Sequence, residues 1–239
     1  MVCSFVDPET IKEWIEICQL MKTLDKMVCF KFTPTELNIQ IIHPSKRCVV
    51  DMKFPSTWFS NYEWKESEFY IPSESLYTIF SLYSGEKLIT MESANKFMNI
   101  KFFHDNQTKN FSIPLHSYSH RDIVIENEKG VQFIMETNYI YPLCKELYTF
   151  GNMLFFNIKN DFFHMISYGK EKMVVEIHPN SVEIITRGDY EKSYELEYLL
   201  IFLKFSKVYS KVTINLNKIL HASIKKEYTI QFYLSPMKS

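Results

Sequence analysis

Four segments of the chain place apolar residues at helical spacing. Helices are therefore expected over 8–24, 73–84, 138–150 and 194–209. In the first, Asp7 is expected to cap the N-terminus and Pro8 to occupy the first helical position. Gly85 and Gly151 are expected to stop the second and third helices. Pro142 is expected to lie in the first turn of the third helix, because proline kinks a helix interior.

Most of the remaining chain is rich in β-branched and aromatic residues with partial alternation, which is typical of strands. Strands are expected over 27–32, 36–43, 47–54, 87–91, 97–103, 110–115, 153–158, 162–168, 173–177, 182–186, 211–216 and 228–234. Short turns at 33–35 and 159–161 would join neighbouring strands. The pattern predicts antiparallel meanders interrupted by single helices, which is an α+β arrangement.

The second half of the sequence repeats the first. Segment 18–32 aligns with 144–158 without a gap, so that Met27 matches Met153. Near the ends of the halves, residues 111–114 (Phe-Ser-Ile-Pro) align with residues 233–236 (Tyr-Leu-Ser-Pro). Each repeat is expected to contain a helix, three strands, a second helix and three further strands. The predicted organisation is a first repeat over 1–115, a polar connector over 116–131 and a second repeat over 132–239.

Composition argues against several kinds of site. The chain has 5 glycines in 239 residues, and they are too dispersed for a dinucleotide-binding turn, a phosphate loop or a nucleophile elbow. Its 5 cysteines contain no CxxC pair, so no zinc ribbon or thioredoxin-type site is predicted. The odd cysteine number and the absence of a signal-peptide pattern predict reduced thiols in a nuclear or cytosolic protein. No apolar run is long enough for a membrane span.

The net charge of −1 gives no overall indication of nucleic-acid binding. A role on DNA would therefore need positive charge gathered on one surface of the protein.

The tandem pair of units, each with two helices and antiparallel strands, resembles the eukaryotic sliding-clamp superfamily over the whole chain. That superfamily contains proliferating cell nuclear antigen and the subunits of the nine-one-one checkpoint clamp. In segment 48–64, a strand followed by Trp58, Phe59 and Tyr62 resembles the checkpoint-clamp subunits, and the Rad-nine subunit most of all. The ending at 230–236 resembles the last strand of the replication clamp. Both subfamilies therefore remain open.

The resemblance implies a non-enzymatic, nuclear clamp subunit in a trimeric ring around double-stranded DNA, with helices lining the channel and strands forming the outer wall. Such a ring scaffolds DNA damage checkpoint and repair proteins. The alternative is a homotrimeric replication processivity factor that tethers a polymerase. Implied partners are DNA, other clamp subunits, a clamp loader and client proteins, with no cofactor. The ring would close through pairing of edge strands near 108–115 and 172–178.

The same resemblance implies two sets of site residues. The DNA-channel lysines would be Lys12, Lys22, Lys145, Lys204, Lys207 and Lys211. Lys12 matches a channel lysine of the family, whereas Glu13 replaces another. These lysines could equally be ordinary solubilising residues on exposed helix faces. A partner-peptide pocket would be formed by Ile42, Cys48, Val50, Ile123, Ile125, Tyr233, Leu234 and Pro236. The alternative for these apolar residues is plain core.

Two other constellations carry little weight. His116 and His120 have a spacing that could hold zinc on a helix, with Asp122 nearby, but they fall in the polar connector. Cys144 and His164 could form a nucleophile and its base, but Cys144 occupies a helical core position. The hypothesis from a different class is an α+β enzyme, or an interaction domain of another kind.

Overall fold

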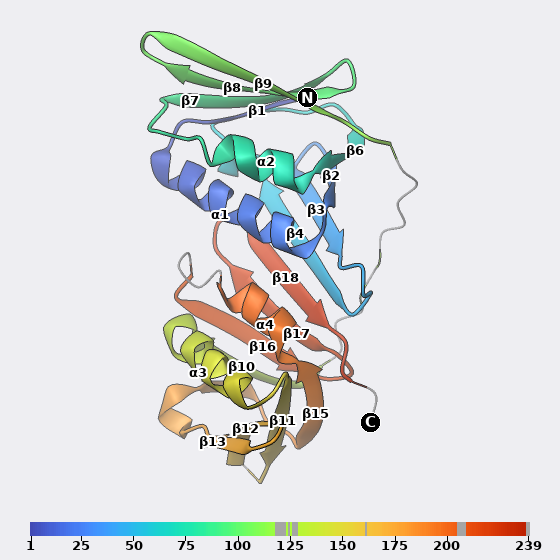
Figure 1. Cartoon of the computed structure of the whole chain (residues 1–239), viewed down its shortest axis with the longest axis vertical. Helices are drawn as coiled ribbons and strands as arrows, with labels where there is room; N and C mark the ends of the chain where they lie inside the picture. Colours follow the sequence, from blue (N-terminus) through green and yellow to red (C-terminus); the bar gives the residue numbers. More distant parts are fainter. Residues whose placement is uncertain (118–122, 124, 126–128, 161, 205–208, 238–239) are drawn as a thin grey trace. The chain divides into compact units, whose positions relative to one another are not determined.

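The computed structural model describes residues 1–117, 123, 125, 129–160, 162–204 and 209–237. Within these residues the chain is an α+β protein with four helices and large antiparallel sheets (Figure 1). The α+β prediction is therefore confirmed. The chain divides into two compact units. Unit 1 consists of Met1–Pro44, Asp51–Ile123 and Lys225–Ile230, and unit 2 consists of Ser45–Val50, Val124–Ile224 and Gln231–Ser239.

The first half of the chain contains nine strands and two helices among the described residues. They are β1 (Val2–Phe5), α1 (Pro8–Leu24), β2 (Met27–Phe32), β3 (Glu36–Ile42), β4 (Cys48–Pro55), the 3-10 turn η1 (Ser56–Trp58), β5 (Asn61–Glu63), β6 (Ser67–Pro72), α2 (Ser73–Phe80), β7 (Leu88–Ala94), β8 (Phe97–His104) and β9 (Gln107–Pro114). Strands β5, β1, β7, β8 and β9 are neighbours in that order, as are β4, β3, β2 and β6.

The second half follows the same sequence of elements. They are β10 (Val131–Glu136), α3 (Thr137–Phe150), β11 (Met153–Lys159), β12 (Phe162–Tyr168), β13 (Lys172–Glu176), η2 (Pro179–Ser181), β14 (Glu183–Thr186), β15 (Tyr190–Glu195), α4 (Leu196–Leu203), β16 (Lys211–Leu216), β17 (Leu220–Lys225) and β18 (Thr229–Leu234). Strands β14, β10, β16, β17 and β18 are neighbours in that order, as are β13, β12, β11 and β15. Element order and strand pairing thus repeat from one half to the other.

The first helix forms where the sequence predicts it. The Asp7 carboxylate accepts a hydrogen bond from the Thr10 backbone N–H at 2.7 Å, which caps α1, and Pro8 occupies the first turn. Apolar residues at helical spacing bury one face, with Ile11 and Trp14 completely covered. Burying such a side chain stabilises the fold by about 2 kcal/mol. Trp14 lies at the centre of the unit 1 core, with ring centroids 5.4 Å from Phe54 and 5.6 Å from Phe5.

Three details of the predicted helices are wrong. Pro142 lies inside α3, beyond its first turn. Because proline has no backbone N–H, it cannot donate the helical hydrogen bond to a carbonyl oxygen of that first turn. The fourth helix begins at Leu196, because Tyr194 and Glu195 belong to β15 and pair with Leu154 and Met153 of β11. The second helix ends at Phe80, well before the expected glycine stop.

The predicted count of three strands is correct after the second helix of each half, but it is wrong after the first helix, which five strands follow within the residues that the structure describes. The sequence pattern did not indicate β1, β5, β6, β10, β15 or β17. Two of these strands, β1 and β5, have only four and three residues, so their alternation spans too few residues to be recognised. Strand β10 starts at Val131, inside the predicted connector, and residues 118–122, 124 and 126–128 of that connector lie outside the described residues.

Candidate functional site

The predicted channel lysines of α1 are both engaged with carboxylates. Lys12 Nζ lies 2.7 Å from Glu9 on the same helix, and Lys22 Nζ lies 2.8 Å from Glu74 of α2. Lys22 also sits over the Tyr77 ring, 5.0 Å from its centroid. Since each ammonium is next to a carboxylate, both lysines contribute less positive potential than the sequence suggests.

The remaining predicted channel lysines are scattered over different elements. Lys145 lies on the exposed side of α3 over the Tyr141 ring, and Lys204 caps the C-terminus of α4. Lys211 is the first residue of β16 rather than part of a helix end, with its Nζ 3.7 Å from Glu136. Lys207 lies outside the described residues.

Glutamates offset the lysines on the helices. Helix α1 carries three glutamates against two lysines, and neither α2 nor α4 contains a lysine. Glu13 accepts hydrogen bonds from Lys226 and from the Tyr228 hydroxyl. Within their bounds the helices of unit 1 carry a net charge of −2 and those of unit 2 a net charge of −1, so any positive potential would have to come from individual lysines.

The residues of the predicted peptide pocket differ in their accessibility. Cys48, Val50, Tyr233 and Leu234 are buried, whereas Ile42, Ile125 and Pro236 are half-buried and Ile123 is 41% exposed. Burial raises the pKa of the Cys48 thiol to about 12, as expected for an inert core cysteine. For the buried members of the set, the core interpretation fits the structure better than the pocket interpretation.

One polar side chain that the sequence did not single out fixes part of the connector. The Gln40 amide accepts a hydrogen bond from the Ile123 N–H at 2.9 Å and donates to the Ile123 carbonyl at 3.1 Å. Its Nε2 also donates to Asp51 at 2.7 Å. A lone glutamine in a strand carries no sequence signal for this role, since its partner lies far along the chain.

The two predicted ring-closing segments coincide with strands at sheet edges in the described part of the chain. Strand β9 ends the order β5-β1-β7-β8-β9, and β13 begins the order β13-β12-β11-β15. Alternate residues of both strands are exposed, and Val174 at the centre of β13 is 49% exposed. Edge strands present backbone donors and acceptors to any further strand, so both are competent for intermolecular pairing.

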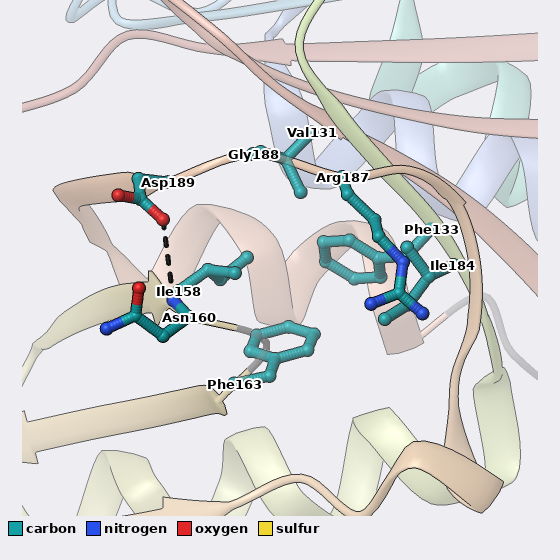
Figure 2. Close-up of a pocket in the computed structure, with 9 residues that line it drawn as sticks. All are labelled: Val131, Phe133, Ile158, Asn160, Phe163, Ile184, Arg187, Gly188 and Asp189. Atoms are coloured by element: carbon teal, nitrogen blue, oxygen red, sulfur yellow. Dashed lines mark hydrogen bonds between the residues drawn. The ribbon is translucent and has the colours of Figure 1, made fainter.

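Unit 2 contains a cleft that the sequence did not indicate. Figure 2 shows its apolar wall, formed by Val131, Phe133, Ile158, Phe163 and Ile184, and its polar mouth, formed by Asn160, Arg187, Gly188 and Asp189. The Phe133 and Phe163 rings meet edge to face at 4.8 Å, and the Asn160 N–H points to Asp189 at 3.4 Å. The cavity has a volume of about 130 Å³, close to the size that accepts one small aromatic ring.

The cysteines and histidines offer no catalytic arrangement in the described residues. All five cysteines are buried and outside disulfides, and burial raises the pKa of Cys144, which keeps it protonated and poorly nucleophilic. His116 pairs through its backbone with Tyr70, while His120 and Asp122 lie outside the described residues. No group of three or more His, Cys, Asp or Glu in the described ranges could hold a metal ion.

Comparison of the chain with models of protein families and with curated proteins gives no match. Among the described residues, no helix combines the length and the apolar character needed to cross a membrane.

Proposed function

We propose that the chain is a non-enzymatic subunit of a DNA sliding clamp, which joins two further subunits in a ring around duplex DNA in the nucleus. The observation that carries the proposal is the repeated order of strand, helix, five strands, helix and three strands, with matching strand pairings in both halves. This arrangement agrees with the tandem fold that the sequence resemblance implies, and it supplies edge strands in both halves for ring closure.

The charges fit a protein held on DNA by topology. A closed ring cannot leave a closed duplex, so it needs no tight phosphate contacts. Exposed lysines that are partly neutralised by Glu9 and Glu74 would permit sliding while still tolerating the phosphate backbone.

Within this class, we favour a checkpoint-type subunit that forms a ring with two different partners and scaffolds damage-signalling and repair proteins. The aromatic segment that supports this choice packs inside unit 1, with Trp58 and Phe59 both buried. A homotrimeric processivity factor is the alternative. Light scattering on the pure chain distinguishes the two, because a homotrimer would have about three times the mass of the 28.6 kDa monomer.

Assembly through the edge strands is tested by Val174→Asp in β13, which puts a charge at the centre of the exposed edge. Ile185→Asp is the matched control, because Ile185 lies in β14 of the same unit and is 50% exposed, against 49% for Val174. We expect Val174→Asp to abolish ring formation, measured as complex mass, and Ile185→Asp to leave it intact. Equal effects of the two substitutions would contradict closure through β13.

The channel assignment is tested by the triple substitution Lys12→Ala, Lys145→Ala and Lys204→Ala in an assembled ring. Each lost phosphate contact should lower the slope of log affinity against log salt by about 0.9. Substituting Lys53, Lys65 and Lys87 by alanine gives a control with the same change in net charge. Unchanged salt dependence in the first variant would overturn the assignment of these lysines to the channel.

A further inference from the structure

The cleft of unit 2 lies where unit 1 holds a large aromatic side chain. In unit 1, Cys3 of β1 pairs with Tyr62 of β5 and Met91 of β7. In unit 2, Phe133 of β10 pairs with Ile184 of β14 and Ile214 of β16. Tyr62 and Ile184 thus lie at corresponding positions of the two edge strands, each opposite a buried residue of the neighbouring strand, although β10 has a register shift between Gln132 and Phe133.

Tyr62 packs between the sheet edge and a neighbouring turn in unit 1. Its ring stacks on Phe32 at 6.2 Å and on Phe59 at 5.4 Å. Its hydroxyl donates to the carbonyl oxygens of Thr33 and Glu36, each at 2.8 Å, and so reaches the turn between β2 and β3. An aromatic side chain with a terminal donor thus fits between this sheet edge and this turn.

Ile184 is too short to reach the corresponding turn of unit 2. Phe133 is larger than Cys3 and occupies part of the space, but a cavity of about 130 Å³ remains between Phe133, Ile158 and Phe163 (Figure 2). A cavity of similar size lined by apolar groups binds a benzene ring. The vacant volume therefore corresponds to one aromatic side chain supplied from elsewhere.

Among the described residues, the lining of the cleft and of its neighbouring groove is basic. An open groove adjoins it and shares Val131, Arg187, Gly188 and Asp189 with it. Together the lining residues carry the cations of Lys129, Arg187, Lys192 and Lys218 against the carboxylate of Asp189. The Lys192 ammonium is held in place because it donates to the carbonyl oxygens of Asn217 and Lys218, at 3.0 and 3.3 Å.

We propose that this cleft and its basic groove form a docking site for an acidic peptide segment of a partner protein. One aromatic side chain of the peptide enters between Phe133, Phe163 and Ile184, and its acidic residues lie along the lysines of the groove. The charge of the groove selects an acidic partner and the cavity selects its aromatic anchor. Single-stranded nucleic acid fits less well, since base stacking needs an open ring face and both phenylalanines are at most 4% exposed.

The test uses the full chain and a fluorescent peptide in which one tyrosine is flanked on both sides by aspartates. Binding is followed by anisotropy at low salt. We expect saturable binding that weakens about tenfold when the tyrosine is replaced by alanine. We also expect it to weaken as salt is added, because the groove is exposed.

Two variants of the chain locate the site. Ile184→Tyr fills the cavity as Tyr62 does in unit 1, and Lys129→Glu with Lys218→Glu reverses the charge of the groove. Each should weaken peptide binding about tenfold or more. Lys53→Glu with Lys65→Glu in unit 1 is the control of equal charge and should change affinity less than about twofold. Circular dichroism checks folding, and the groove variant remains decisive if Ile184→Tyr does not fold.

The proposal is overturned if the peptide does not bind, if the alanine peptide binds equally well, or if the groove variant and its control behave alike. The proposal would also be overturned if a short single-stranded oligonucleotide displaced the peptide and bound more tightly than the peptide does. The measurement needs neither DNA nor a ring. Its failure would therefore leave the proposed clamp function untouched, and failure of ring assembly would leave the docking site untouched.

Discussion

The two units have the same order of helices and strands but differ in the side chains that pack inside them. In unit 1, one aromatic cluster occupies the interior. Trp14 lies at its centre, and its ring centroid is within 6.2 Å of the ring centroids of five other residues, Phe5, Phe30, Phe54, Trp58 and Phe80. In unit 2, a smaller cluster surrounds Phe156, which lies 6.1 Å from Phe163 and 6.2 Å from Tyr194. The same backbone plan thus holds the Tyr62 ring at one edge-strand position of unit 1 and leaves a cleft beside Ile184 in unit 2.

The exchange of side-chain sizes explains this difference. A small cysteine faces a large tyrosine across β1 and β5, whereas a large phenylalanine faces a smaller isoleucine across β10 and β14. The exchange conserves the packed volume only in part, because Ile184 is shorter than Tyr62, whose hydroxyl reaches the turn between β2 and β3. The cleft beside Ile184 is therefore a space that the Tyr62 ring occupies at the matching place in unit 1.

The largest expected effect comes from removing the centre of the unit 1 cluster. Trp14→Ala should lower the free energy of unfolding by about 4 kcal/mol, because it leaves a cavity among buried rings. Ile140→Ala changes the aligned position of α3, which is equally buried, and should cost about 3 kcal/mol. Urea denaturation measures both. A smaller loss for Trp14→Ala than for Ile140→Ala would contradict the contrast between the units.

A buried carboxylate makes unit 1 sensitive to acid. Burial alone would raise the pKa of Glu86, but its ion pair with Lys109 at 2.6 Å and its hydrogen bonds with Ser84 lower the pKa to about 2, from 4.5. Unit 2 has Tyr209 at the matching place, two residues before β16. The folded pKa lies below the unfolded one, so this contribution is present above about pH 4.5 and is lost as the pH falls towards 2.

Glu86→Gln should therefore cost about 3 kcal/mol of stability at pH 7. The difference from the unsubstituted chain should shrink as the pH falls through the range between 4.5 and 2. Thermal unfolding at a series of pH values measures this dependence. A difference that stays constant over that range would show that the Glu86 charge does not stabilise the fold.

A smaller loss of stability is expected when the Tyr62 hydroxyl is removed. Tyr62→Phe keeps the stacked ring but removes the donor to the turn carbonyls, which should cost about 1 kcal/mol. Tyr62→Ile copies unit 2 and should cost more, since it opens a cavity as well. Chemical denaturation compares the two variants, and equal losses would contradict the filling role of the ring.

The smallest effect is expected at an exposed lysine. Lys12→Ala removes an ion pair with Glu9 whose side chains are 62% and 75% exposed, so stability should be nearly unchanged. Any change in DNA binding by this variant would then report on charge rather than on folding. A large loss of stability would show that Lys12 has a structural role.

Several features followed directly from the sequence because their causes are local. The bounds of α1 were predicted correctly from Asp7, Pro8 and the apolar spacing, and the structure shows the capping bond. Strands β2, β12 and β16 also have the predicted bounds. In each case the residues that determine the element lie within it or beside it.

The missing features depend on partners that are distant in the sequence. Tyr194 continues a helical pattern but pairs with β11 instead, because the ladder fixes its conformation. The glutamate that pairs with Lys22 is on another helix, so the sequence overstated the positive charge of α1. The cleft was invisible because it results from Ile184 being shorter than Tyr62, and the two positions can be matched only once the pairing is known.

The central claim is that this chain belongs to a ring that encircles DNA, and retention on circular DNA tests it most directly. The assembly formed by the full chain is loaded onto nicked circular plasmid and passed over a sizing column at raised salt. The account predicts that the chain elutes with the closed plasmid and is released when one restriction cut linearises it, since only topology holds it there. Equal retention on circular and linear DNA, or loss from both, would contradict the account.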